Sequence, residues 1–171
     1  MMYQFSTIRL ATFRVTFTMH KTIISDTSCL IVLTTIGEIE LLQKMYGTIT
    51  TTIEVATEYG QSLPEWIEIT APTDQYRQRI LELQLDIGEA SAIALALESP
   101  DCTIILDDYK ARKVAQRLGV HITGTIGVII KAKLNGLIPS ILPLIQKIRQ
   151  TDFRISDELE KQALIVAREI F

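Results

Sequence analysis

Short apolar segments alternate with helix-like segments along most of this chain, and that alternation restricts the fold more than any other feature. Five segments are apolar or β-branched and too short for typical helices: Thr22–Ser25, Thr48–Thr50, Ile67–Thr70, Thr103–Leu106 and Val120–Thr123. Strands separated by helices favour parallel pairing, because a parallel connection needs a crossover that a helix supplies. We therefore predict a three-layer α/β/α sandwich around a central, mostly parallel sheet.

The helix-like segments carry apolar residues at helical spacing or are ended by glycine. They are Ser28–Thr35, Glu38–Tyr46, Thr52–Tyr59, Asp74–Gln84, Glu89–Glu98, Tyr109–Leu118, Thr125–Leu134, Pro139–Gln150 and Asp157–Ile170. The segment EASAIALALE is apolar nearly all round, which predicts a buried helix that begins after Gly88. In the last segment, Asp157 and Glu160 have the spacing of a capping box.

A chain of 171 residues, 47% of them hydrophobic, is long enough for one domain with a full core. We place that domain at residues 19–171. Residues 1–18 stand apart, because they hold Arg9, Arg14 and several Ser and Thr but no acidic residue. That composition is typical of an organelle transit peptide. The alternative, which we favour, is an irregular or non-native leader before a start at Met19.

The charge and the cysteine count exclude several classes of protein. A formal net charge of −3 argues against a generally basic nucleic-acid binder, although it allows an enzyme that uses a local basic rim and bound metal. Two cysteines in apolar stretches predict core thiols of a reducing compartment, the cytoplasm, rather than a zinc site. No apolar run reaches the length of a membrane span.

Two of the predicted strands end on aspartate. Asp26 follows the run TIIS, and Asp107 and Asp108 follow the run TIIL. Sites in parallel α/β sheets form beyond the carboxyl ends of the strands, where the chain order reverses. Because a buried carboxylate is costly without a positive partner, two carboxylates in one crevice predict a cation site.

Glutamates on two helices are candidates for the same crevice. Glu89 begins the buried helix, where its carboxylate either stabilises the first turn or lies beside the strand ends. Glu54 and Glu58 stand four residues apart on one helix face, and either one of them faces the crevice or both are solvated.

Five stretches follow one another between Ile23 and Ile138: IISDTSCLIVL, VATEYG, IGEASAIALA, IILDDYKARKVAQRLG and ITGTIGVIIKAKLNGLI. In this order and at this spacing they resemble the PIN-domain nucleases, and above all a prokaryotic subgroup of mostly unassigned function. The resemblance extends to the toxin nucleases of toxin–antitoxin pairs. It implies a parallel α/β/α fold that cleaves single-stranded RNA with a divalent metal, Mg²⁺ or Mn²⁺, held by three or four acids.

Carried over residue by residue, the resemblance implies four catalytic acids: Asp26, Glu58, Glu89 and Asp107. Glu58 is preferred to Glu54, because the family glutamate stands three residues after a core aliphatic residue, here Val55. Strand register favours Asp107 over Asp108.

Further roles follow from the same resemblance. The implied metal ligands are Asp26, Glu89, Asp107 and Asp108, and the residues implied to line the site are Ser28, Thr123 and Thr125. Three basic residues after the aspartate pair either guide RNA phosphates or form a solvated helix face: Lys110, Arg112 and Lys113. The final helix either closes its own domain or binds a second copy or an antitoxin protein.

Carboxylates suit Mg²⁺ or Mn²⁺, because these ions prefer hard oxygen ligands. The sequence has neither a recognisable Ser/Cys–His triad nor a glycine-rich P-loop, which argues against covalent catalysis and an NTPase. The main alternative is a non-catalytic PIN-like module that binds RNA or protein. A small-molecule phosphatase or a receiver domain would also cluster aspartates at strand ends, but the receiver's phosphoacceptor and lysine are not recognisable.

Overall fold

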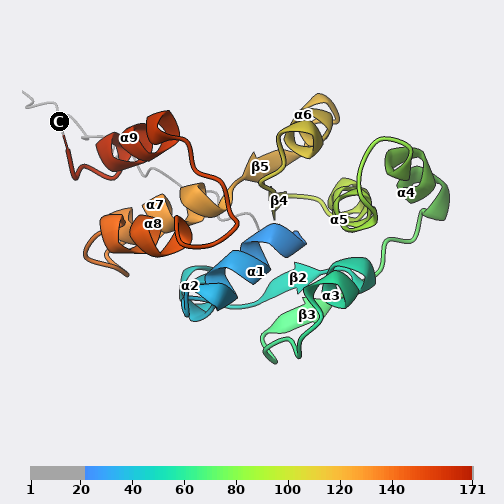
Figure 1. Ribbon diagram of the computed structural model, residues 1–171. Helices are drawn as coiled ribbons and strands as arrows, with labels where there is room; N and C mark the ends of the chain where they lie inside the picture. The colour runs from blue at the N-terminus through green and yellow to red at the C-terminus, as the bar shows by residue number, and fades with distance from the viewer. Residues whose placement is uncertain (1–21, 171) are drawn as a thin grey trace, which may run out of the picture.

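A computed structural model describes residues 22–170, in which the chain forms a five-stranded sheet. The strands are β1 (Thr22–Ser25), β2 (Ile49–Thr51), β3 (Ile67–Ile69), β4 (Cys102–Ile105) and β5 (His121–Thr123). They are ordered β3-β2-β1-β4-β5, and every neighbouring pair is parallel. Helices pack around this sheet, which confirms the predicted α/β/α sandwich (Figure 1). The leader predicted at residues 1–18 lies outside the described residues.

The chain order reverses between β1 and β4, at the centre of the sheet. β2 and β3 lie on one side of β1, whereas β4 and β5 lie on the other. Ile24 of β1 pairs with Thr50 of β2 and with Ile104 of β4. The backbone N–H of Asp26 donates to Ile105 O at 3.1 Å, which extends the central pairing by one residue. Ligands bind at such reversal points in open α/β sheets, so a site is expected where β1 and β4 end.

Nine helices surround the sheet within residues 22–170. They are α1 (Thr27–Thr35), α2 (Glu40–Tyr46), α3 (Ile53–Tyr59), α4 (Gln75–Glu82), α5 (Ile87–Glu98), α6 (Tyr109–Arg117), α7 (Thr125–Leu134), α8 (Leu142–Ile148) and α9 (Asp157–Val166). In Figure 1, α7, α8 and α9 gather on the opposite side of α1 from α4 and α5. The order of elements agrees with the alternation in the sequence, and most boundaries differ from the prediction by one or two residues.

Helix α5 forms the centre of the core, as its composition predicts. It packs against β1 and β4 and buries a row of small side chains: Ala90, Ala92, Ala94 and Ala96. The helix begins at Ile87 rather than at Glu89, so Gly88 lies inside its first turn and does not break it. Cys29 and Cys102 are buried free thiols, as predicted.

The two C-terminal helices are shorter than predicted. Pro143 stands in the first turn of α8, where its missing N–H is tolerated, and residues 139–141 are not helical. At the other end, α9 stops before Arg168, which has a positive φ of 61°. Glu169 then accepts hydrogen bonds from Ser140 Oγ and Ile141 N at 2.7 and 2.6 Å. Glu169 therefore caps the start of α8.

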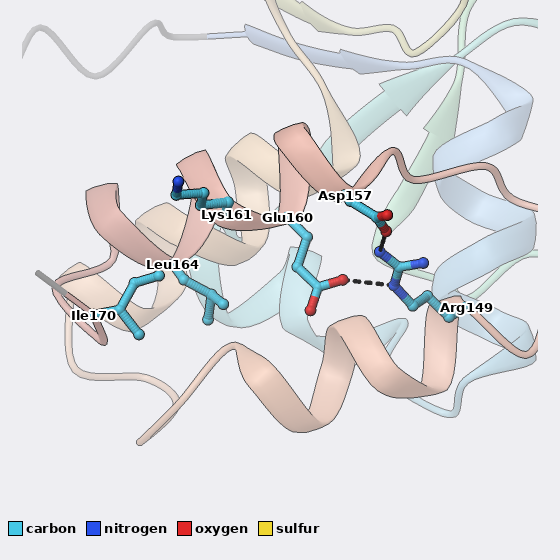
Figure 2. Close-up of a pocket in the computed structure, with 6 residues that line it drawn as sticks. All are labelled: Arg149, Asp157, Glu160, Lys161, Leu164 and Ile170. Carbon is cyan, nitrogen blue, oxygen red and sulfur yellow. Dashed lines mark hydrogen bonds and ion pairs between the residues drawn. The ribbon is translucent and has the colours of Figure 1, made fainter.

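The predicted capping box of Asp157 and Glu160 is wrong. Ser156 is the N-cap of α9, because its Oγ accepts from Leu159 N at 3.1 Å. The two carboxylates instead bind Arg149, which follows α8 directly, at 2.7 and 2.5 Å (Figure 2). Arg149 thus joins the end of α8 to the first turn of α9, and it fixes both ends of the segment 150–156 between them.

No helix in the described part of the chain combines the length and the apolar character that crossing a bilayer requires.

Candidate active site

Asp26 lies at the centre of the site, directly after β1. Its backbone continues the pairing with β4, and its side chain is only 3% exposed. Asp26 precedes α1, but its Oδ1 is buried and has no hydrogen-bond partner among residues 22–170. Burial and the negative charges of Glu58 and Asp107 together raise the pKa of Asp26 to about 7, although backbone hydrogen bonds from Thr27 and Ser28 oppose the rise. An ionised carboxylate in this position therefore lacks a positive partner.

Asp107 follows β4 by two residues and is held by the start of α7. The N–H and hydroxyl of Thr125 donate to its two carboxylate oxygens at 2.8 and 2.5 Å. Burial raises the pKa of Asp107, whereas the bonds from Thr125 and the charge of Arg112 oppose that rise. Arg112 is anchored by a 2.8 Å hydrogen bond from Nη1 to Leu106 O. The carboxylate is therefore fixed in orientation without being neutralised by a direct ion pair.

Glu58 is directed toward Asp26 by Thr27. The Thr27 hydroxyl donates to Glu58 Oε2 at 2.8 Å, and the Glu58 charge acts on Asp26. Glu54 instead accepts from Gln78 Nε2 at 2.9 Å, so it belongs to the contact with α4. The two glutamates that the sequence left open as alternatives thus have different surroundings, and Glu58 is the one near the strand ends.

Glu89 lies at the start of α5, where it has two neighbours of different kinds. It accepts from Asp86 N at 3.3 Å, which is the helix-start role expected for an acid in the first turn. Burial raises the pKa of Glu89 to about 7, with added repulsion from Asp108 and Asp26. Asp108 is itself the N-cap of α6, because its Oδ1 accepts from Ala111 N at 2.8 Å. Glu89 therefore joins the acidic group, whereas the Asp108 carboxylate is already used by a helix.

A hollow of about 710 Å³ opens beside these acids. Glu89, Asp107 and Asp108 line it together with part of α1 and the segment 150–154. Asp26 and Glu58 lie next to this group but are not among the residues that line the hollow. Within residues 22–170, no three His, Cys, Asp or Glu side chains stand close enough to hold one metal ion as they are placed. The strand ends thus bring the acids to one region without closing them into a coordination shell.

The donor set nevertheless fits a hard divalent cation. The Asp26 Oδ1 atom is buried without a partner, which is the position that a cation would satisfy. Burial raises the pKa of three neighbouring carboxyl groups, those of Asp26, Glu89 and Asp107, and a dication would reverse that effect. Carboxylate oxygens are the ligands that Mg²⁺ and Mn²⁺ prefer.

The other residues expected at the site lie in different places. Ser28 lines the acidic hollow, and Thr123 lines a neighbouring hollow that also contains Arg112. Lys113 lies 4.7 Å from the centre of the Tyr109 ring. Lys110 is exposed and is not among the residues that line either hollow.

Two glycines are necessary for the geometry, and the sequence analysis missed both roles. A Cβ atom on Gly88 would lie 2.6 Å from Glu58 Oε2 and 3.4 Å from Thr27 Oγ1. A Cβ atom on Gly124 would lie 2.9 Å from Asp107 Oδ1 and equally close to Arg112 Nη1. Both glycines therefore allow a carboxylate of the acidic group to lie against a helix start. A glycine in the stretches IGEAS and ITGTI gives no sign of this, because the crowding comes from residues distant in sequence.

The segment 150–154 was also missed. It forms part of the wall of the acidic hollow, although it follows Asp107 by more than forty residues. No feature of the sequence QTDFR connects it with the strand ends. Its place becomes evident only once α8 and α9 are packed.

Comparison with known proteins agrees with this geometry. A family model for the PIN domain matches residues 22–169, which is nearly the whole described chain. No curated protein and no solved structure gave a significant match. The match includes both central strands, the four acids and the C-terminal helices. The chain therefore belongs to the PIN-domain family.

Proposed function

We propose that this protein is a metal-dependent endoribonuclease that cleaves single-stranded RNA, with four catalytic acids: Asp26, Glu58, Glu89 and Asp107. The observation that carries the proposal is the buried, unpartnered Oδ1 of Asp26, placed between two strand ends and beside three other acids whose charges act on one another. PIN domains are usually nucleases, they typically use divalent metals, and they typically bind nucleic acids.

Each acid has a distinct part in the proposed site. Asp26 and Asp107, at the centre of the sheet, would hold Mg²⁺ or Mn²⁺ together with Glu89. Thr125 keeps Asp107 in one orientation, and Thr27 does the same for Glu58. When bound, the metal supplies a water of lowered pKa and stabilises negative charge on the scissile phosphate. Asp108 is a weaker candidate ligand, because its carboxylate caps α6.

The reaction is a hydrolysis. Water adds to phosphorus, the bond from phosphorus to one ester oxygen breaks, and one fragment ends in a phosphate monoester and the other in a hydroxyl. The preference for RNA over DNA rests on the resemblance of the sequence to PIN nucleases.

The biological setting follows from the same resemblance. A toxin–antitoxin pair would give the nuclease an antitoxin protein as its partner, and a homodimer is the other expected assembly. The two buried free thiols suit a reducing cytoplasm.

A non-catalytic PIN-like module that binds RNA or protein is the second candidate function. One observation favours it: within residues 22–170, the acids do not stand close enough to form a metal-binding group. In that case the acids would have no catalytic role and would only repel the phosphates of RNA. Their removal would leave RNA binding unchanged or make it stronger.

One experiment distinguishes the nuclease from the non-catalytic binding module. A pool of single-stranded RNAs is incubated with Mg²⁺ or Mn²⁺ and either wild type, Asp26→Asn or Glu54→Gln. Glu54 is a matched control, because it is a carboxylate on the same helix as Glu58 but bonds to Gln78. The nuclease predicts cleavage by wild type and Glu54→Gln and loss of cleavage in Asp26→Asn. Binding without cleavage in all three proteins would select the module.

A further inference from the structure

A second hollow of about 490 Å³ adjoins the acidic hollow. Three residues line both of them: Asp107, Phe153 and Arg154. The boundary between the two hollows therefore lies at one of the proposed catalytic acids and at the segment between α8 and α9. A strand bound across the acids would continue into this second hollow.

The two hollows differ in chemistry. The first is lined by Glu89, Asp107, Asp108 and Asp152, so a polyanion is repelled there unless a cation intervenes. The second hollow adds Tyr109 and Arg112 to the shared Phe153 and Arg154, and Asp107 is its only acid among residues 22–170. The rest of its lining is Thr123, two glycines and four aliphatic residues: Ile122, Ile126, Ile130 and Leu159. Phosphates favour arginine, and unpaired bases stack on aromatic rings. The second hollow thus has the chemistry that the nucleotides flanking a cleaved bond require.

Arg154 is the available cation of this hollow. It is exposed and makes no hydrogen bond or ion pair with any residue from 22 to 170. Arg112 is different, because its Nη1 is engaged by Leu106 O. Tyr109 begins α6, directly after the aspartate pair, and its side chain is 70% exposed. Lys113 Nζ lies 4.7 Å from the centre of the Tyr109 ring, and the tyrosine side chain is nevertheless largely exposed. One arginine and one tyrosine are therefore accessible beside Asp107, and a base would stack on the ring face that Lys113 does not cover.

The segment that carries Arg154 is held in place. Phe153 packs against the core, and its N–H donates to Thr151 Oγ1 at 3.1 Å. Arg149 joins the two ends of the segment by binding Asp157 and Glu160 (Figure 2). A long arginine on a fixed backbone loses less conformational freedom on binding than one on a free loop.

We infer that this second hollow is a subsite for the nucleotide next to the scissile phosphate, in which Arg154 binds a backbone phosphate and Tyr109 stacks with the base. The subsite deepens the proposed nuclease function and rests on it. Its ligand is a single strand rather than a duplex, because a base paired in a helix does not offer its face to Tyr109.

Binding of a fluorescein-labelled, mixed-sequence RNA of twelve nucleotides tests the subsite. The titrations use the Asp26→Asn background, so that the RNA survives, and they are repeated over a range of salt concentrations. Arg154→Ala should weaken binding about tenfold and reduce the salt slope by about 0.7, the value for one single-strand phosphate. Arg154→Lys should restore the slope. Tyr109→Ala should weaken binding about fivefold or more with the slope unchanged.

Matched controls are available on the same molecule. Arg117 and Tyr76 are exposed and are not among the residues that line either hollow, so Arg117→Ala and Tyr76→Ala should bind RNA like the parent. With Asp26 restored, Arg154→Ala should raise KM more than it lowers kcat.

The outcomes separate the subsite from the nuclease. If wild type cleaves RNA but Arg154→Ala and Tyr109→Ala match their controls in affinity and salt slope, the subsite is wrong and the nuclease stands. If wild type neither binds nor cleaves the RNA, the nuclease proposal fails and the subsite fails with it.

Discussion

Asp107 and Thr125 are joined by two hydrogen bonds, one from the backbone N–H and one from the hydroxyl of Thr125, each to a different carboxylate oxygen. This pair connects the end of β4 to the start of α7, the helix that follows the neighbouring strand β5. Thr125 therefore holds Asp107, an acid of the proposed metal site, in one orientation, and Thr125 need not contact the metal itself.

Thr125→Val removes the hydroxyl but keeps the shape of the buried side chain. Since the Thr125 bonds lower the pKa of Asp107, their partial loss should raise it and weaken metal binding at neutral pH. Loss of a supporting hydrogen bond of this kind typically costs about 10–100-fold in metal affinity or activity. Cleavage rates measured against Mn²⁺ concentration and pH should show a higher half-saturating concentration and an acid limb moved to higher pH. The control is Thr57→Val, on the exposed face of α3, which should change neither the half-saturating Mn²⁺ concentration nor the acid limb of the pH profile.

Gly88→Ala should impair the site without unfolding the protein. The added methyl group would meet the end of the Glu58 side chain, which can swing away, while alanine favours a helix over glycine by roughly 1 kcal/mol. We expect a free energy of unfolding near that of wild type and cleavage reduced about tenfold. A double-mutant cycle with Glu58→Gln measures the coupling. Additive effects of the two changes would show that Gly88 does not act through Glu58.

Stability should fall as the pH rises through the range in which Asp26 ionises. Burial raises its pKa from 3.8 to about 7 in the folded state, so the folded protein keeps a proton that the unfolded chain has lost. The stability is therefore full below pH 4 and declines up to pH 7, by at most about 4 kcal/mol at 1.4 kcal/mol per pKa unit. In thermal melts without metal, Asp26→Asn should gain stability over wild type at pH 8 and not at pH 4. An equal difference at both pH values would contradict the raised pKa.

Arg149→Met should loosen the segment 150–156 while the rest of the domain stays folded. The change removes both ion pairs that fix the ends of the segment. These ion pairs lie at the surface, so their loss should change the free energy of global unfolding only slightly. Hydrogen exchange should become faster for amides 150–156 and stay unchanged in α5. Lys161→Met is the control. Lys161 and Arg149 line one surface hollow between α8 and α9, but Lys161 makes no ion pair with residues 22–170 (Figure 2). Unchanged exchange in Arg149→Met would mean that Phe153 alone holds the segment.

The sheet and the two central aspartates could be predicted, because they depend on local signals. Apolar runs of four residues between helices indicate parallel strands, and the rule for reversal points then places Asp26 and Asp107 together. The position of two glutamates on one face of α3 does not choose between Glu54 and Glu58, and only the family resemblance favoured Glu58. Their hydrogen bonds are between distant segments: Glu58 accepts from Thr27 beside Asp26, and Glu54 accepts from Gln78.

Other parts of the site could not be predicted, because they depend on contacts between distant segments. Gly88 stands before an alanine-rich run and looks like a helix break, yet it lies inside α5, where Glu58 and Thr27 approach it closely. The segment 150–154 has no pattern of its own. It reaches the acidic hollow only through the packing of α8 and α9 and the contacts of Arg149.

The central claim is that the acids at the ends of β1 and β4 bind a divalent metal. The most direct test is calorimetric titration of Mn²⁺ into wild type, Asp26→Asn and Glu54→Gln at pH 7 in two buffers of different ionisation enthalpy. Burial raises the pKa of both Asp26 and Glu89 to about 7, so metal binding should release protons. We predict binding with proton release in wild type and Glu54→Gln, and loss of binding in Asp26→Asn. Equal Mn²⁺ binding by all three proteins, or binding by none, would contradict the account.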